Sequence, residues 1–412
     1  MILQVSIFAA VGVAALVHFG GIALLFARSR GVAGHAPHGR PPVTVLRPAC
    51  GIENFVEETL TSTFALDYPD YEVVFCVADE RDPVIPLIRR LMAGHPDVPS
   101  RLLVGDDRIS INPKLNNLVK GWHAAANDWI VMTDSNVLMP PDYLDRVLER
   151  WEPDTGLVCS PPVGTRPDGL GAELESAFLN TYQARWQLIA DALGTAYAQG
   201  KTMFWRRDYL DDAGSIEALA AEPAEDAAST KLIRAAGRKV RLVIHPFPQP
   251  LGVRAVADVW NRQVRWARLR RSSFPLVYAP EAVSGGFFPL TGAAALVAMG
   301  ALPIVGFIGL AIAWYGAELL LARRYDWPAS PRIAGLMIVR DLLLFPLWIV
   351  GWTGNTFVWR GNAMDIKDEG TPLRRLVERW STSRVVRSAV ALATGRRTVA
   401  NMERGNGAPP GG

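Results

Sequence analysis

Three aspartates stand where a carboxylate could do chemistry. Asp79 and Asp134 each follow an apolar run that we expect to be a strand, and Asp226 begins an alanine-rich run that we expect to be a helix. A carboxylate such as Asp134, in the run Thr-Asp-Ser-Asn, can hold a divalent cation against a diphosphate, because hard cations prefer oxygen ligands and bridge to phosphates. Asp79 could accept hydrogen bonds from a base or ribose, and Asp226 could remove a proton from an acceptor hydroxyl.

Each of these residues also has a structural explanation. An aspartate followed by Ser and Asn, as at Asp134, commonly opens a turn. An aspartate at a helix start, as at Asp226, satisfies unpaired N–H groups and interacts with the helix dipole. Lys114, in the run Asn-Pro-Lys, could face a phosphate or could be a solvated residue of a first helical turn. Taken one at a time, the motifs leave both explanations open.

A basic segment adds a second kind of chemistry. Residues 262–271 read RQVRWARLRR. On a helix, Arg262, Arg265 and Trp266 share one face by their i, i+3, i+4 spacing, and two guanidinium groups can clamp a diphosphate. The alternative is a basic helix at a membrane surface. Both can hold at once, with the remaining arginines at the lipid surface: Arg268, Arg270 and Arg271.

Strands and helices alternate through the segment that carries these residues, 29–280. Apolar runs predict strands at 43–47, 71–77, 101–104, 129–133 and 157–159. Helices are expected between them, at 53–63, 83–93, 114–126 and 141–150. This alternation indicates a parallel sheet covered on both faces, which binds ligands at the carboxyl ends of its strands, where Asp79 and Asp134 fall. No Gly-x-Gly-x-x-Gly run or P-loop appears, so a dinucleotide or P-loop site is not favoured.

The composition excludes several classes of protein. The chain has 412 residues, of which 50% are apolar and 20% charged, with a net charge of +3. It is therefore too apolar for a disordered chain, and its charge gives no reason to propose a nucleic-acid partner. The cysteines, Cys50, Cys76 and Cys159, are far apart and suggest neither a disulfide framework nor a zinc site.

Long apolar stretches predict contact with a membrane. Residues 1–28 are long enough for an N-terminal transmembrane anchor, and the arginines that follow place the next segment in the cytoplasm. Residues 281–322 are too long for one straight span and predict a transmembrane hairpin. The third stretch, 333–359, carries Arg340 and Asp341, and charges at membrane depth are costly unless they are paired or face protein. It could span, re-enter or lie in the interface.

The C-terminal segment, 360–412, is basic. Residues 371–412 contain eight Arg and only two Glu, which predicts a cytoplasmic tail at an anionic lipid surface. A cytoplasmic tail requires an even number of crossings after residue 280. The Ala-, Gly- and Arg-rich composition suggests a bacterial source, and together with the apolar stretches it predicts a protein of the bacterial inner membrane.

In their order along the chain, four of these features resemble the D, D, D, (Q/R)xxRW signature of membrane glycosyltransferases with a GT-A fold: Asp79, Asp134, Asp226 and Arg262-x-x-Arg265-Trp266. The sequence is most similar to glycosyltransferase family 21, the ceramide glucosyltransferases. The resemblance covers roughly residues 41–271 and the anchor layout, with a familiar Trp-Arg-Gly-Asn run at 359–362. It departs from the wider GT-A pattern at Asn136, where an aspartate is usual, and this leaves Asp134 as the main carboxylate ligand.

The resemblance implies a fold and a reaction. The fold is α/β, a GT-A domain with a Rossmann-like, mostly parallel sheet over residues 29–280, including a basic interfacial helix at 258–271, between N- and C-terminal transmembrane helices. The reaction is an inverting transfer of a hexose, with glucose from UDP-glucose the first expectation, to the primary hydroxyl of a membrane lipid. Ceramide is the expected acceptor, and the product would be a β-glycosylceramide.

The resemblance also implies a role for each residue. Asp79 would contact the uridine, Lys114 the donor, and Asp134 a Mg²⁺ or Mn²⁺ ion on the diphosphate. Asp226 would be the general base. The basic helix would stabilise the departing UDP through Arg262 and Arg265, and place Trp266 beside the sugar or acceptor.

Other functions fit parts of the sequence. Another lipid, such as a hopanoid, could be the acceptor, including one that receives N-acetylglucosamine. A processive polysaccharide synthase shares the same motifs, but it needs more membrane helices than the three or four segments expected here. A non-enzymatic membrane protein would be favoured by loss of the acidic positions, yet all three are present. The sequence does not indicate the oligomeric state.

Overall fold

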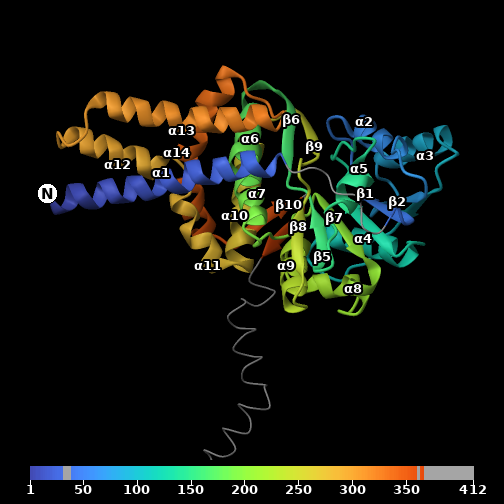
Figure 1. Ribbon diagram of the computed structural model, residues 1–412. Coiled ribbons are helices and arrows are strands. Elements are labelled where there is room, and N and C mark those ends of the chain that lie inside the picture. Colours follow the sequence, from blue (N-terminus) through green and yellow to red (C-terminus); the bar gives the residue numbers. More distant parts are fainter. Residues whose placement is uncertain (31–38, 360–361, 366–412) are drawn as a thin grey trace, which may run out of the picture. The chain divides into compact units, whose positions relative to one another are not determined.

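The computed structural model describes residues 1–30, 39–359 and 362–365. A seven-stranded sheet with the order β3-β2-β1-β4-β7-β5-β8 forms its centre (Figure 1). The strands are β1 (Val43–Pro48), β2 (Tyr71–Val77), β3 (Ser100–Val104), β4 (Trp129–Thr133), β5 (Thr155–Cys159), β7 (Thr202–Arg206) and β8 (Lys239–Leu242). All neighbouring strands are parallel except at β7, which runs antiparallel to β4 and β5. The expected mostly parallel sheet is therefore confirmed.

Burial on both faces explains why the strands are readable as apolar runs. Every residue of β1 is buried, and separate apolar clusters cover the two faces of the sheet. Arg47 is the one charged residue of this strand, and Nη2 of its guanidinium donates to the backbone oxygen of Thr59 at 2.7 Å. Two further strands, β6 (Val163–Asp168) and β9 (Pro248–Val253), pair separately. Their prolines make a strand hard to predict.

Helices follow the strands and carry the candidate site residues. Those nearest the sheet are α2 (Val56–Thr61), α3 (Val84–Gly94), α4 (Pro113–Ala124), α5 (Tyr143–Leu148), α8 (Arg207–Asp211) and α9 (Glu225–Ala235). The start of α4 is fixed by Asn112, whose side chain accepts hydrogen bonds from the backbone N–H groups of Lys114 and Leu115. Proline at the next position suits a first helical turn. This cap places Lys114 at the carboxyl end of the sheet.

A long helix connects the sheet to the apolar part of the chain. It comprises α6 (Gly169–Phe178), a π-helical turn η2 (Leu179–Ala184) and α7 (Arg185–Ala192). Helix α10 (Val256–Ser273), which covers the expected basic helix, packs against α6. The short helix α11 (Pro275–Tyr278) and a 3-10 turn η4 (Ala279–Val283) follow it.

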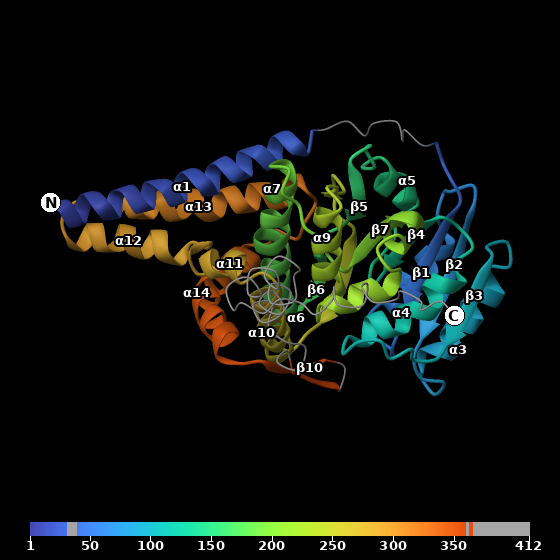
Figure 2. The same ribbon diagram turned by 90° about the horizontal axis from the view of Figure 1, so that it is seen from below.

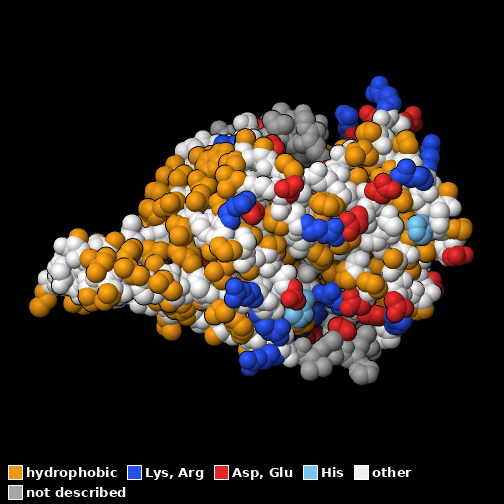
Figure 3. All heavy atoms as spheres, turned by 90° about the horizontal axis from the view of Figure 1, so that it is seen from above, with side chains coloured by type: hydrophobic (Ala, Val, Ile, Leu, Met, Phe, Trp, Pro, Cys, Tyr) orange, Lys and Arg blue, Asp and Glu red, His pale blue; other side chains and the backbone are white. Residues whose placement is uncertain are grey.

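Within the described part of the chain, four helical segments are long and apolar enough to cross a membrane. They are α1 (Ile2–Arg28), Pro275–Ala298 including α12 (Phe287–Ala298), α13 (Ile304–Arg324) and α14 (Pro331–Thr353). Helices α1, α12 and α13 contact one another and project together from the sheet (Figure 2). Hydrophobic side chains cover these projecting helices, and charged ones gather over the sheet (Figure 3).

The chain reverses between α12 and α13, as the expected hairpin requires. The carboxyl ends of α1 and α13 then meet beside the sheet, where Arg28 forms an ion pair with Asp191 at 2.6 Å. Arg324 donates to the backbone oxygen of Ser29 at 2.8 Å. The connection at the opposite end of the hairpin, residues 299–303, carries no charge.

Helix α14 packs against α6 and α10, and its charged residues are paired. Arg340 lies 3.0 Å from Glu318 of α13 and 2.8 Å from Asp341, and all three side chains are at most 1% exposed. These charges at membrane depth are therefore paired and face protein, as the sequence analysis required of them. The helix ends at Thr353, before β10 (Thr356–Trp359) and β11 (Asn362–Asp365), which form a small sheet. The expected basic tail, beyond residue 365, lies outside the described residues.

Breaking this buried cluster should destabilise the fold. In Arg340→Met, Glu318 and Asp341 lose a partner in a site that excludes water, a change that typically costs about 3–5 kcal/mol. We expect a clear fall in the melting temperature of the purified protein in detergent. Arg332→Met on the same helix is the matched control, because Arg332 is 65% exposed and pairs with Glu173 at 3.3 Å. Equal shifts of the melting temperature in both variants would contradict a stabilising role for the buried cluster of Arg340.

Candidate active site

One cavity of about 1920 Å³ connects the carboxyl end of the sheet with the apolar helices. Its lining includes all the residues predicted for the site except Asp79: Lys114, Asp134, Asp226, Arg262, Arg265 and Trp266. These come from four separate elements, the helices α4, α9 and α10 and the turn after β4. The topology therefore gathers residues that are far apart in the sequence into one space.

Asp134 lies between two lysines at the polar end of the cavity. One carboxylate oxygen is 2.7 Å from Nζ of Lys114, and the other is 2.9 Å from Nζ of Lys201. Burial alone would raise the pKa of Asp134, but the two ammonium groups hold it well below its usual value. Lys201 also donates to Oδ1 of Asn136 at 3.0 Å. The carboxylate is consequently ionised throughout the neutral range.

Glu225 and Asp226 occupy the first turn of α9, as expected for helix-start acids, yet both face the cavity. Glu225 is held by Lys114 at 2.8 Å and by Nδ2 of Asn112 at 2.6 Å. Asp226 accepts a hydrogen bond of 3.2 Å from the backbone N–H of Gly200. Burial, together with the negative charge of Glu225, raises the pKa of Asp226 to about 7. A carboxyl with such a pKa is suited to accept a proton near neutrality.

Asp79 has a different environment. It follows β2 as predicted, but its side chain is 60% exposed and accepts a 2.9 Å hydrogen bond from the backbone N–H of Arg81. This local hydrogen bond holds the pKa of Asp79 below its usual value. The preceding residue, Ala78, lines the cavity. The structure therefore places Asp79 at the rim of the site, apart from the cluster around Lys114.

The donor atoms around Asp134 are compatible with a hard divalent cation. Among the described residues, no group of three or more His, Cys, Asp and Glu could hold a metal by itself. Asp134 and Asn136 nevertheless both line the cavity, and their side chains carry the oxygen ligands that such a cation prefers. Mg²⁺ and similar ions need only one or two protein ligands when water and substrate phosphates complete the shell. The residues present thus fit a cation that arrives with a diphosphate.

Helix α10 presents Arg262, Arg265 and Trp266 to the cavity, on one face as their spacing predicted. Arg262 forms an ion pair with the fully buried Glu175 of α6. Arg270 differs from the expectation of a lipid-surface residue: it lines the cavity and pairs with Glu281 at 2.8 Å. Glu281 lies in η4, so the spacing of the arginines along α10 could not reveal this ion pair.

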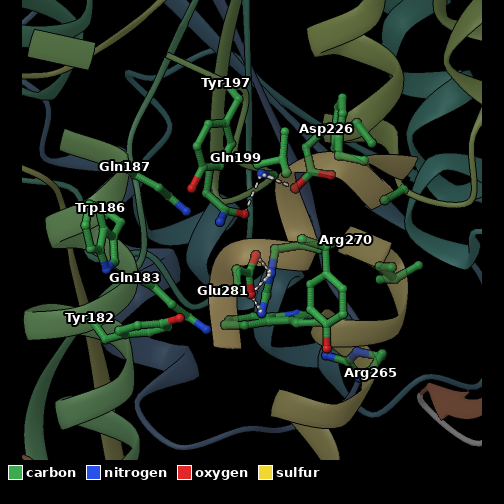
Figure 4. A pocket seen from close by; sticks show the side chains of 18 of the residues that line it. Tyr182, Gln183, Trp186, Gln187, Tyr197, Gln199, Asp226, Arg265, Arg270 and Glu281 are labelled. Carbon is green, nitrogen blue, oxygen red and sulfur yellow. Dashed lines mark hydrogen bonds and ion pairs between the residues drawn. The ribbon is translucent and has the colours of Figure 1, made fainter. Parts of the chain in front are cut away.

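A row of polar residues in the middle of the cavity was not predicted (Figure 4). Tyr182, Gln183, Trp186 and Gln187 come from η2 and α7, and Tyr197 comes from the loop that follows. No motif marks these residues, since glutamines and aromatic residues on a helix are common. Lys201, directly before β7, was not among the predicted residues either, although its Nζ lies 2.9 Å from Asp134.

The far end of the cavity is apolar. Its lining there comes from α1 and α12 and the turn before α12, and includes Ile7, Val11, Ala14, Val17, Val283, Phe288, Pro289 and Gly292. A single space therefore offers charged groups at the sheet and hydrocarbon surface between the apolar helices. Such a space matches a ligand with a polar head and an apolar chain.

Comparison with known families and proteins gives a consistent result. The family model described as Glycosyl transferase family 21 matches residues 8–372. Ceramide glucosyltransferase 1 of Caenorhabditis elegans is 28% identical over 243 residues, which cover 58% of this chain and 52% of that protein. Ceramide glucosyltransferase of Komagataella phaffii is 33% identical over 208 residues, covering 45% and 41%. The chain thus spans about half the length of the curated relatives it matches, or less.

A solved structure supports the fold. A mannosyltransferase from Pyrobaculum calidifontis, in complex with GDP-Man and Mn²⁺, superposes with a TM-score of 0.52 at 19% identity. The match covers 82% of this chain and 98% of that one. At this identity the likeness concerns the fold alone, and it agrees with the expected GT-A architecture.

Proposed function

Because the chain belongs to glycosyl transferase family 21, we propose that it transfers a sugar from a nucleotide sugar to a membrane lipid. The observation that carries this proposal is the single cavity that joins Asp134 and Asp226 to the apolar space between α1 and α12. A water-soluble donor can enter at the sheet, while the acceptor can keep its hydrocarbon chain among the helices.

The relatives suggest the donor and the acceptor. Those named above are ceramide glucosyltransferases, and on that basis we assign UDP-glucose as donor and ceramide as acceptor. The reacting group is then a primary hydroxyl on the lipid, and attack from the face opposite UDP inverts the anomeric carbon to give a β-glucoside. Asp79, at the rim, is assigned to the uridine.

Asp226 is the general base in this proposal. The backbone N–H of Gly200 fixes one of its carboxylate oxygens at 3.2 Å, and its burial favours the protonated form that results from proton transfer. The lipid hydroxyl gives its proton to Asp226 as its oxygen bonds to the sugar, and the bond between sugar and diphosphate breaks. Nearby, Trp266 forms a wall for the sugar or acceptor.

Positive groups stabilise the charge that develops on the leaving diphosphate. Arg262 and Arg265 approach from α10, and Lys114 and Lys201 approach from the sheet side. Asp134, with Asn136 beside it, would hold Mg²⁺ or Mn²⁺, which when bound neutralises diphosphate charge. Groups placed in advance around a developing charge make one of the largest contributions to catalysis.

The charges at the helix ends indicate the orientation in the membrane. Arg28, Arg30, Arg323 and Arg324 lie at the ends of α1 and α13 that meet beside the sheet. Since positive residues favour the cytoplasmic side, we assign the active site to the cytoplasm, at the inner membrane of a bacterium.

The rate should depend on pH through Asp226. Its pKa of about 7 predicts that kcat/KM falls roughly tenfold per unit as the pH drops below 7, because only the ionised carboxylate accepts a proton. In Glu225→Gln the neighbouring negative charge is lost, so the midpoint should move to lower pH. A pH–rate profile between about pH 5 and 9 checks this. A rate that stays level down to pH 5 would show that Asp226 does not act as the base.

The proposed transfer is tested with the purified full-length protein in lipid nanodiscs. UDP-glucose labelled in the glucose is added with ceramide, with and without EDTA, and the label in the lipid extract is counted. We expect label in the lipid phase, with loss on EDTA treatment. If the label moves only into a hopanoid or another lipid, that lipid and not ceramide is the acceptor. Label that stays in water with every donor and lipid tried would overturn the function.

A further inference from the structure

The polar row in the middle of the cavity contains unsatisfied hydrogen-bond acceptors. Gln183 and Gln187 are 8% and 4% exposed, and both line the cavity. In each, Oε1 is buried and has no hydrogen-bond partner among the described residues. A buried acceptor without a partner is costly, so an unpaired acceptor in the wall of a cavity can be satisfied by a hydrogen-bond donor that occupies that space.

Both amides are hydrogen-bonded to neighbouring side chains. Nε2 of Gln183 donates to Oε1 of Gln263 at 2.8 Å. Burial raises the pKa of Tyr197, and a side-chain hydrogen bond with Gln187 partly opposes this rise. Each amide thus has a neighbour, and the atom of each glutamine that has no partner within the described part of the chain is its acceptor oxygen.

The π-helical turn places these residues on the wall of the cavity. Gln183 belongs to η2 and Gln187 to α7, and Figure 4 shows both extending into the same space as Arg270 and Asp226. Between them Trp186 also lines the cavity, and its Nε1 donor is buried and unpartnered among the described residues. Single π-helical turns occur frequently at functional sites.

We propose that Gln183 and Gln187 select acceptors that carry hydrogen-bond donors close to the reacting hydroxyl. Two free acceptor oxygens and one free indole N–H are complementary to a group with N–H or O–H donors and a carbonyl. An N-acyl amino alcohol, the class that includes ceramide, has an amide and a further hydroxyl at this position. A diacylglycerol or a monohydroxylated terpenoid has no donor beyond the hydroxyl that reacts. This inference rests on the proposed lipid-transfer function.

The test compares acceptors as well as variants. The full-length protein is given a short-chain ceramide, its N-methyl amide analogue and a diacylglycerol, each with UDP-glucose. We expect the wild type to lose about 10- to 100-fold in kcat/KM with the N-methyl analogue, since the site would leave a buried acceptor unpaired. The experiment needs no mutation, so it does not depend on the folding of a variant. Equal use of ceramide and the two other lipids would overturn the inference.

The variants assign the discrimination to particular residues. In Gln187→Met and Gln183→Met, kcat/KM for ceramide should fall, while the ratio between ceramide and its N-methyl analogue should approach one. The KM for UDP-glucose should not change. Gln249→Met is the matched control: its Oε1 is also buried and unpartnered among the described residues, but it lies outside the cavity lining. An unchanged ratio in both cavity variants would contradict the assignment.

A binding measurement separates this inference from the function on which it rests. Thermal stabilisation of the protein by each lipid is recorded without UDP-glucose. Suppose that the wild type transfers sugar to none of the lipids, and that ceramide nevertheless stabilises it more than the N-methyl analogue does. The proposed function then fails, and the selection by Gln183 and Gln187 remains. If transfer occurs and the lipids stabilise the protein equally, only the selection fails.

Discussion

Asp226→Asn is expected to lower kcat by about 10²–10⁴-fold, the usual contribution of a general base. The substitution keeps the size of the side chain and its contact with Gly200 but removes the ability to accept a proton. Because burial and Glu225 already disfavour the ionised form, the variant should not be less stable. The pKa of Asp226 is higher in the folded state than in the unfolded state, so the folded state holds the proton more tightly. Asp226 therefore lowers the free energy of unfolding progressively as the pH rises from about 4 to above 7. At pH 8 the melting temperature of Asp226→Asn should equal or exceed that of the wild type.

The control for this variant is Asp208→Asn. Asp208 also lies in the first turn of a helix, α8, but it faces solvent and pairs with Arg206 outside the cavity lining. Loss of the Asp208 carboxylate should leave kcat unchanged. Activity of Asp226→Asn within a few-fold of the wild type would show that Asp226 only begins a helix.

Asp134→Ala should lower kcat/KM by about 10²–10³-fold, comparable to the loss of one electrostatic group in an active site. Removing the carboxylate leaves Lys114 and Lys201 close together without the negative charge that holds them. It also removes the main ligand for a cation. We therefore expect weaker binding of UDP in the presence of Mn²⁺, measured by calorimetry.

The matched control is Asp128→Ala, at the other end of β4. Asp128 precedes that strand and is exposed, whereas Asp134 follows it and faces the cavity. The control should bind UDP as the wild type does. If Asp134→Ala and the wild type bind UDP equally well in the presence of Mn²⁺, Asp134 does not take part in donor binding.

Part of the fold could be predicted because its physical cause is local in the sequence. The strand expected at 71–77 matches β2 exactly in extent, since both faces of that strand are covered and nearly every side chain must be apolar. The hairpin expected after residue 280 rested on the length of the apolar stretch and on the Gly and Pro residues in its middle, and the chain reverses there between α12 and α13. By contrast, β9 contains Pro248 and Pro250, and only its pairing with β6 makes it a strand.

The site was predictable in its residue types but not in its connections. Asp134 and Asp226 stand out because each ends or begins an element at the carboxyl side of the sheet. That Lys114 links Asp134 to Glu225 depends on tertiary packing, which the sequence spacing does not contain. The same holds for Arg270, whose partner Glu281 follows it on a separate turn. Polar residues of the cavity wall, such as Gln187, have no sequence signature.

The structure of the product tests the central claim most directly. The lipid formed from UDP-glucose and ceramide by the purified protein would be isolated and examined by NMR. The account predicts one glucose in β linkage on the primary hydroxyl of the lipid, as in-line attack assisted by Asp226 requires. An α-linked product, or glucose on another hydroxyl, would contradict the proposed arrangement of donor, base and acceptor in this cavity.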